Sequence, residues 1–557
     1  MKKIFFLSLT VFFSFGIFAQ AGQGGTSDSQ SGGQVLLPDL TTTLEGDNVE
    51  VPEGAAPDFS QVQADSIAEK DSLPKLPESN SQIVPEENVA DGKESFKKEV
   101  YAEGQLGGGY PGFFTGLFQL YKDSLSNPFT LNFSHTTNNG YGRNSASQGY
   151  FSKTSDFDGR KKITFKNMEV NLQGAFSAND LGLQQRSQTF YDISKQKLST
   201  VDSIEWTFPL GFGLLLTNNL SWYSRYSGLK DSSASYLAQE AQAASLIENP
   251  YMKFYWSNKV FTFALDGGYS FEGFFSDAKD SDLVTSINRG TFGAGLSYKK
   301  DIFAFDSAFN ILVGNALGSQ ADFLVPFHLN VDFTWPVNYS AQPIRFSAGG
   351  GLKSSLPLFE EVEKNYSFAK MYQLATEESD WYAEASIQIP GGNIFSLDAN
   401  VLFKTTAFSN GVWTADYENI NSNNLYDFVQ TSRTLLDSYL KATFAWNIFN
   451  LSFDCKSHWL YVPANEYQFM AGAAFDVNGA SGLWGAKLEV KEAFGKQSQD
   501  LLPFINLSGY YRMTSSMRAA FEVNDIIKLF SGENRFYYNS SYSINSAGLA
   551  LLLKFYL

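Results

Sequence analysis

The chain has 557 residues, of which 43% are hydrophobic and 16% aromatic, and its formal net charge at pH 7 is −17. This acidic balance argues against a nucleic-acid partner, because nucleic-acid binding needs basic patches. The single cysteine, Cys455, excludes an internal disulfide and a metal site built from several thiolates.

Residues 1–21 are predicted to form a secretory signal peptide. Two lysines at positions 2 and 3 precede an apolar run over residues 4–18, and Ala19-Gln20-Ala21 offers an Ala-x-Ala cleavage site. The run of about 15 apolar residues is shorter than the ~20 that a membrane-spanning helix needs. Cleavage after either alanine fits the pattern. No cysteine lies near the site, which argues against a lipid anchor.

Residues 22–99 are predicted to be a disordered, acidic periplasmic segment. They contain 16 acidic and five basic residues and six of the 17 prolines, and Phe59 is their one aromatic residue before Phe96. Such a segment cannot bury enough apolar surface to offset the entropy of ordering it. Residues 35–44 (VLLPDLTTTL) are apolar and β-prone. They are either a chance cluster or a docking peptide that adds a strand to a periplasmic partner.

From about residue 100 the sequence alternates between apolar and polar residues. Clear examples are residues 261–272, 325–335 and 449–461. These runs are 11 to 13 residues long, whereas soluble strands peak at ~5–6 residues and a tilted membrane-crossing strand needs ~9–11. The chain is rich in phenylalanine, yet its mean hydropathy is only −0.20. One strand face is therefore expected to meet lipid and the other a polar interior.

The connections between these runs differ in length. Short turns are predicted at 218–219, 390–393, around 447 and at 478–479, where Asn and Gly tolerate the positive φ of tight hairpins. Long polar connections are predicted at 229–249, 357–380 and 406–435. Short periplasmic turns and long outer loops are typical of outer-membrane barrels. Residues 236–248 and 359–377 have a composition that favours a helix. They either fold into the barrel mouth or, as we favour, decorate the surface.

These patterns predict an all-β fold in which residues 100–557 form a large, antiparallel, up-and-down transmembrane β-barrel of about 22 strands (range 18–24). The C-terminal residues Leu549, Leu551, Leu553, Phe555 and Leu557 alternate with less apolar positions. This pattern resembles the closing strand that barrel-assembly machinery recognises, although such strands often end in Phe. The expected location is the outer membrane of a diderm bacterium, with the lipid bilayer and the assembly machinery as partners.

No catalytic, cofactor-binding or metal-ligating residues are predicted, and the chain is expected not to be an enzyme. The histidines are His135, His328 and His458, and the last two lie on the polar faces of predicted strands. We expect them to be hydrogen-bonded residues of the barrel interior. The sequence has no nucleophile elbow, zinc-protease or P-loop motif. The predicted inward face carries both signs of charge: Asp266, Glu272, Asp332, Asp398, Asp454 and Glu522, with Lys404, Lys441, Lys456, Arg512 and Arg518.

A family resemblance lies in residues 101–114 (YAEGQLGGGYPGFF) and 132–142 (NFSHTTNNGYG). They resemble the opening strands of TonB-dependent-receptor-like barrels that lack a plug. The resemblance implies an uptake barrel. A true receptor also carries a long ordered plug. Residues 22–99 are too few, and are predicted to be too disordered, to form one, so the resemblance does not imply TonB-coupled transport.

Two functions are therefore consistent with the sequence. The first is a pore or uptake conduit for small polar solutes. The second is an outer-membrane anchor whose loops or N-terminal tail bind a partner.

Overall fold

The computed structural model describes most of the chain from Val100 onward, namely residues 100–122, 127–230, 242–276, 286–315, 323–340, 342–356, 358–370, 378–391, 394–407, 412–420, 424–462, 467–479, 481–494, 502–536 and 542–556. The predicted signal peptide (1–21), acidic segment (22–99) and docking peptide (35–44) lie outside these residues. Within the described ranges, no helix combines the length and the apolar composition needed to cross a membrane.

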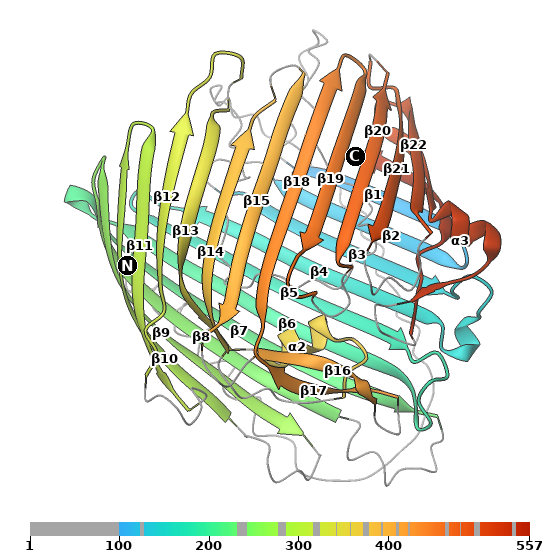
Figure 1. Ribbon diagram of the computed structural model, residues 1–557, viewed down its shortest axis with the longest axis horizontal. Helices are drawn as coiled ribbons and strands as arrows, with labels where there is room; N and C mark the ends of the chain where they lie inside the picture. The colour runs from blue at the N-terminus through green and yellow to red at the C-terminus, as the bar shows by residue number, and fades with distance from the viewer. Residues whose placement is uncertain are drawn as a thin grey trace, which may run out of the picture. The chain divides into compact units, whose positions relative to one another are not determined.

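Twenty-two strands form one antiparallel sheet that closes on itself (Figure 1). The strand β1 (Val100–Tyr110) pairs with β2 (Phe113–Lys122) on one side and with β26 (Gly548–Tyr556) on the other. At this closing seam, Gln105 lies opposite Lys554. The Lys554 ammonium also pairs with the Glu103 carboxylate of β1 at 3.2 Å. The all-β prediction of about 22 strands is confirmed.

The remaining barrel strands follow in chain order around the ring. They are β3 (Phe129–Asn139), β4 (Phe151–Thr164), β5 (Met168–Gly182), β6 (Phe190–Thr207), β7 (Phe212–Leu229), β8 (Gln242–Ser257), β9 (Phe261–Ser276), β10 (Ser286–Lys300), β11 (Phe303–Gly314), β12 (Phe327–Trp335), β13 (Ile344–Ser355), β14 (Glu378–Ile389), β15 (Phe395–Thr406), β18 (Thr434–Trp446), β19 (Phe449–His458), β20 (Phe469–Asn478), β21 (Trp484–Phe494), β22 (Phe504–Thr514) and β23 (Met517–Asn524).

Shorter elements lie in the connections. They are the 3-10 turns η3 (Ala146–Gln148) and η4 (Pro209–Gly211), the helices α2 (Phe359–Asn365) and α3 (Ile526–Ser531), and two small hairpins, β16 (Val412–Ile420) with β17 (Tyr426–Thr431) and β24 (Arg535–Phe536) with β25 (Ser543–Ile544).

The alternation of each strand separates the two faces of the barrel wall. In β9, Phe263 and Leu265 are among the exposed large apolar side chains, whereas the intervening polar positions share a face with inward residues of β8 and β10. The last strand behaves in the same way, with Leu549 and Leu551 exposed and Ala550 buried. A closed barrel with an apolar outer surface and a polar inner face satisfies its backbone hydrogen bonds within a bilayer. The chain is therefore an outer-membrane barrel.

The two ends of the barrel differ in their connections. One end carries short turns, including the two-residue turn between β18 and β19, where Asn447 has φ 55°. The other end carries the long connections 356–377, 407–433 and 525–547. By the rule that outer-membrane barrels have short periplasmic turns and longer outer loops, the second end is extracellular. We call it the mouth.

Two local predictions are wrong. Asn218 and Asn219 lie in the middle of β7, opposite Asp202 and Val201 of β6, and do not form a turn. Residues 242–248, expected to be part of a helix and of a long connection, belong to β8. In both places a long ladder to the neighbouring strands outweighs a local preference, since propensity is a weak guide where tertiary pairing supplies the hydrogen bonds.

Candidate functional site

The β13–β14 connection folds into the barrel at the mouth. Its helix α2 lies inside the ring, against the inner faces of β6 to β9 (Figure 1). The helix has Glu360 and Glu361 in its first turn and Lys364 in its last turn, an arrangement that suits the helix dipole. A seven-residue helix is unstable by itself. Its contacts with the barrel wall must therefore hold it.

An aromatic contact fixes the start of α2. The Phe359 side chain is fully buried and meets Tyr223 of β7 and Phe274 of β9 edge to face, with ring centroids 5.5 Å and 5.0 Å apart. The Phe359 N–H donates to the Glu272 carboxylate of β9 at 3.0 Å. Burying such a side chain stabilises the contact by about 1.5–3 kcal/mol.

Ion pairs fix the rest of α2 to the wall. Glu363 pairs with Arg225 of β7 and, at 3.3 Å, with Lys195 of β6. Glu360 pairs with Lys197 of β6. The side chains of Arg225 and Glu363 are each only 1% exposed, so water screens this pair little.

Two further hydrogen bonds extend this contact. Ser221 of β7 donates to Glu360 at 3.4 Å, and Arg225 also donates to the Ala369 carbonyl beyond the helix at 3.0 Å. We call the inward-facing residues that hold α2 the α2 wall: Lys195, Lys197, Ser221, Tyr223, Arg225, Glu272 and Phe274.

An apolar cluster joins several connections across the mouth. This mouth cluster consists of Leu183, Phe190, Ile193, Phe368, Ala415, Leu425, Tyr426 and Tyr542. Its members come from the β5–β6, β13–β14, β15–β18 and β23–β26 connections and from β6. Because β6 lies far around the ring from β18 and β26, these loops pack together over the opening.

Tyr542 lies at the centre of the mouth cluster. Its ring stacks on Phe368 with centroids 3.7 Å apart and an interplanar angle of 6°, and its hydroxyl donates to the Asn424 carbonyl at 3.2 Å. Burial raises the pKa of the Tyr542 phenol, so the side chain stays neutral. Next to it, Ser543 exchanges two backbone-to-side-chain hydrogen bonds with Gln184, both 2.8 Å long.

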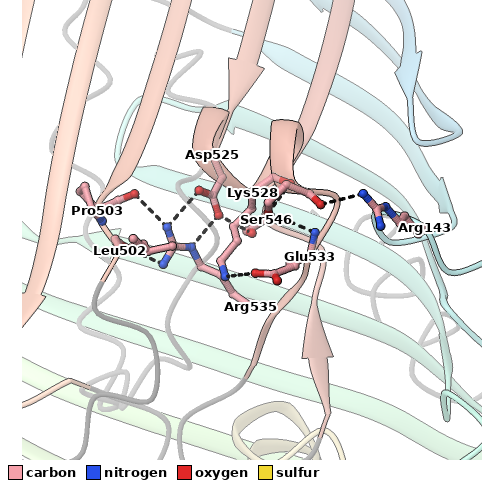
Figure 2. Close-up of polar contacts among 9 residues, drawn as sticks. Arg143, Leu502, Pro503, Asp525, Lys528, Glu533, Arg535 and Ser546 are labelled. Atoms are coloured by element: carbon pink, nitrogen blue, oxygen red, sulfur yellow. Dashed lines mark hydrogen bonds and ion pairs between the residues drawn. The ribbon is translucent and has the colours of Figure 1, made fainter.

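The β23–β26 connection has its own anchor (Figure 2). The Arg535 guanidinium binds both Asp525 oxygens, at 2.5 Å and 2.9 Å. It also donates to the carbonyls of Leu502 and Pro503 at 2.8 Å and 2.9 Å. The Ser546 hydroxyl donates a third side-chain hydrogen bond to the Asp525 carboxylate, at 2.6 Å. This bidentate, fully buried pair is a strong, geometrically specific contact.

The structure places the predicted interior residues as expected. His328 pairs with Asp306 at 2.8 Å and His458 with Asp437 at 2.7 Å, so each is a hydrogen-bonded residue of the inner wall. Opposite charges also face each other across strands, with Lys441 opposite both Asp398 and Asp454. Among the described residues, no group of three or more His, Cys, Asp or Glu side chains could hold a metal ion.

The sequence did not identify the α2 wall or the mouth cluster. The prediction that residues 359–377 decorate the surface is wrong for α2, because Phe359, Glu360 and Glu363 hold the helix on the inner wall of the barrel. A usable signal was present: Lys195 and Lys197 lie on one strand face, and Glu360 and Glu363 lie on one helix face.

Comparison with known proteins identifies the fold. No protein-family model and no curated protein match the sequence. The iron transporter FrpB from Neisseria meningitidis (F5-1 variant) aligns with a TM-score of 0.62 at 10% identity, over 83% of each chain. The chain has the fold of these receptor-type outer-membrane barrels. The siderophore receptor PirA from Acinetobacter baumannii gives a TM-score of 0.59 at 9% identity, over 84% of this chain and 81% of that chain.

The copper transporter OprC gives a TM-score of 0.58 at 10% identity, over 82% of this chain and 80% of that chain. At such low identities the comparisons establish the fold alone. The resemblance to TonB-dependent-receptor-like barrels is confirmed at that level.

Proposed function

We propose that the chain is a plugless outer-membrane conduit for the uptake of small polar solutes, closed at the mouth by its own loops. The observation that carries the proposal is the position of α2, which lies inside the ring and is held on the inner wall by Arg225, Lys195 and Lys197. The described residues all belong to the barrel strands and their connections. In this proposal, α2 and the mouth cluster take the place of a plug.

The contacts of α2 suit a closure that can open. The helix has two buried apolar side chains, Phe359 and Val362, and its acidic side chains Glu360 and Glu363 hold it to the wall through ionic contacts. Ionic contacts can be exchanged for water or for a solute, whereas a large apolar core cannot. Loops with few buried apolar contacts are the segments that open at low free energy.

The test is permeability of proteoliposomes to a small neutral sugar. The wild-type barrel is expected to show low permeability. A variant in which residues 359–365 are replaced by a Gly/Ser segment of equal length is expected to show a large increase. The matched control is Phe530→Ser on α3, because Phe530 is 82% exposed and lies outside the mouth cluster. A heat-modifiable, folded α2 variant that remains impermeable would contradict the conduit.

The second function, an anchor that binds a partner through loops or tail, stays a prediction. Its motivation is the apolar segment 35–44, which lies outside the described residues. Deletion of 35–44 should remove one periplasmic partner from a crosslinking pull-down, and an unchanged partner set would reject the docking peptide. Recognition of β26 by barrel-assembly machinery and the absence of enzymatic activity also stay predictions.

A further inference from the structure

The contact between α2 and the α2 wall leaves polar groups on both sides without hydrogen-bond partners: the Glu272 Oε2 and Glu363 Oε2 atoms are buried acceptors of this kind within the described part of the chain. Lys195, Lys197 and Arg225 face two carboxylates, those of Glu360 and Glu363. In addition, the Arg225 Nε and the Tyr223 hydroxyl are buried and have no hydrogen-bond partner within the described part of the chain. A buried donor without a partner is unfavourable, because it has given up its hydrogen bonds to water. The wall therefore holds donors that α2 leaves unused, and the fit between helix and wall is incomplete.

Opening of α2 would leave these cations without their partners. Arg225 is 2% exposed and Lys195 has a side-chain exposure of 11% in the closed state. Loss of these carboxylate partners is unfavourable for the cations, because only water then compensates their charge. A solute that brings its own oxyanions offsets this cost, whereas a neutral solute does not. Entry of an anion and departure of the helix are thus favourable together.

We infer that the α2 wall is a binding site for small dicarboxylates, and that Glu360 and Glu363 occupy it as an internal substitute for such a ligand. The inference rests on the proposed conduit and names its solute class. Residues three apart on a helix have Cβ atoms about 5–6 Å apart on one face. The helix thus presents two carboxylates at the spacing of a short dicarboxylic acid. Arginine and lysine are the side chains that bind carboxylates most strongly.

Glu272 is the acidic member of the α2 wall, and unlike the cations it contacts the backbone of α2 rather than its carboxylates. Its carboxylate accepts the backbone N–H of Phe359 at 3.0 Å, so it orients the start of the helix. It lies on β9, three strands from Lys195 and Lys197 on β6 and two strands from Arg225 on β7. The lysines and the arginine therefore form a cationic surface on β6 and β7.

If the helix and the ligand compete for the same cations, substitutions in the helix and in the wall should change succinate affinity in opposite directions. With purified, folded barrel, calorimetric titration with succinate should show binding. The double variant Glu360→Gln/Glu363→Gln removes the competing charges and should bind succinate at least tenfold more tightly. The double variant Lys195→Met/Lys197→Met removes the site and should bind at least tenfold more weakly. Arg225→Met should weaken binding in the same direction. Sorbitol should bind to none of them.

A purely structural role for these ion pairs predicts a different result, since both double variants would then disturb the same loop in the same direction. Equal succinate affinity in the two double variants, or no succinate binding in the wild type and in Glu360→Gln/Glu363→Gln, overturns the inference. Sugar permeability of the α2 replacement variant is measured in parallel. Permeability of this variant without succinate binding rejects the anion site and keeps the conduit, whereas a folded variant that is no more permeable than the wild type rejects the conduit itself.

Discussion

Two loops at the mouth are each held by a buried arginine–carboxylate pair, and the two pairs differ in where their members lie. Arg535 and Asp525 both belong to the β23–β26 connection, ten positions apart. Arg225 belongs to the barrel wall and Glu363 to the loop that folds onto it. The first pair ties a loop to itself (Figure 2), and the second ties a loop to the surface that a solute would pass.

The hydrogen-bond partners sharpen this difference. The Nε and both terminal nitrogens of Arg535 donate to protein oxygens, and the guanidinium lies 3.5 Å from the centroid of the Phe504 ring. Arg225, by contrast, keeps a buried Nε with no hydrogen-bond partner among the described residues. The same pair chemistry thus produces a fixed anchor in one loop and an exchangeable contact in the other.

The largest expected effect comes from Arg535→Ala. The change leaves the buried Asp525 carboxylate without its cation and should destabilise the β23–β26 connection by about 3–5 kcal/mol. Since cleavage by a protease tracks the population of the open form, chymotrypsin should cut at Phe530 roughly 100-fold faster or more. Arg143→Ala is the control, because Arg143 donates one exposed hydrogen bond to the Ser531 carbonyl. Unchanged cleavage in Arg535→Ala would show that Arg535 is not the anchor.

The next effect is expected from Phe359→Leu, which keeps an apolar side chain but removes both edge-to-face ring contacts. Each such contact is worth about 0.5–1.5 kcal/mol, so the closed position of α2 should lose about 1–3 kcal/mol. Sugar permeability of proteoliposomes should rise about tenfold, while chymotrypsin cleavage at Phe530 stays at the wild-type rate. A change in cleavage with no change in permeability would reverse the roles assigned to the two loops.

The barrel could be predicted from the sequence because each strand shows its own alternation of apolar and polar residues. The alternation in residues 261–272 and 449–461 separates the two wall faces locally, and the inward position of charges such as Asp454 and Lys441 follows from it. The site could not be predicted in this way. Arg225 and Glu363 are separated by 138 positions. No local sequence pattern indicates that a loop packs against a particular part of the barrel wall.

The wrong predictions have the same physical origin. Asn218 and Asn219 have turn chemistry, but they lie within a ladder of 18-residue strands, β6 and β7, whose combined pairing outweighs one local signal. In residues 359–377, composition correctly indicated a helix at Phe359–Asn365. Its burial depended on cations contributed by β6 and β7, which the loop's own sequence does not contain.

The smallest expected effect on sugar permeability comes from Tyr542→Phe, which tests how the mouth cluster is held together. The stacked ring on Phe368 remains, and only the hydrogen bond to the Asn424 carbonyl is lost. A neutral hydrogen bond contributes about 1 kcal/mol, so sugar permeability should rise less than tenfold. Tyr542→Ala, which also removes the ring, should exceed Phe359→Leu. If the two substitutions at 542 instead had equal effects, the hydroxyl rather than the stacked ring would hold the mouth cluster together, and closure there would be polar, as it is at the α2 wall.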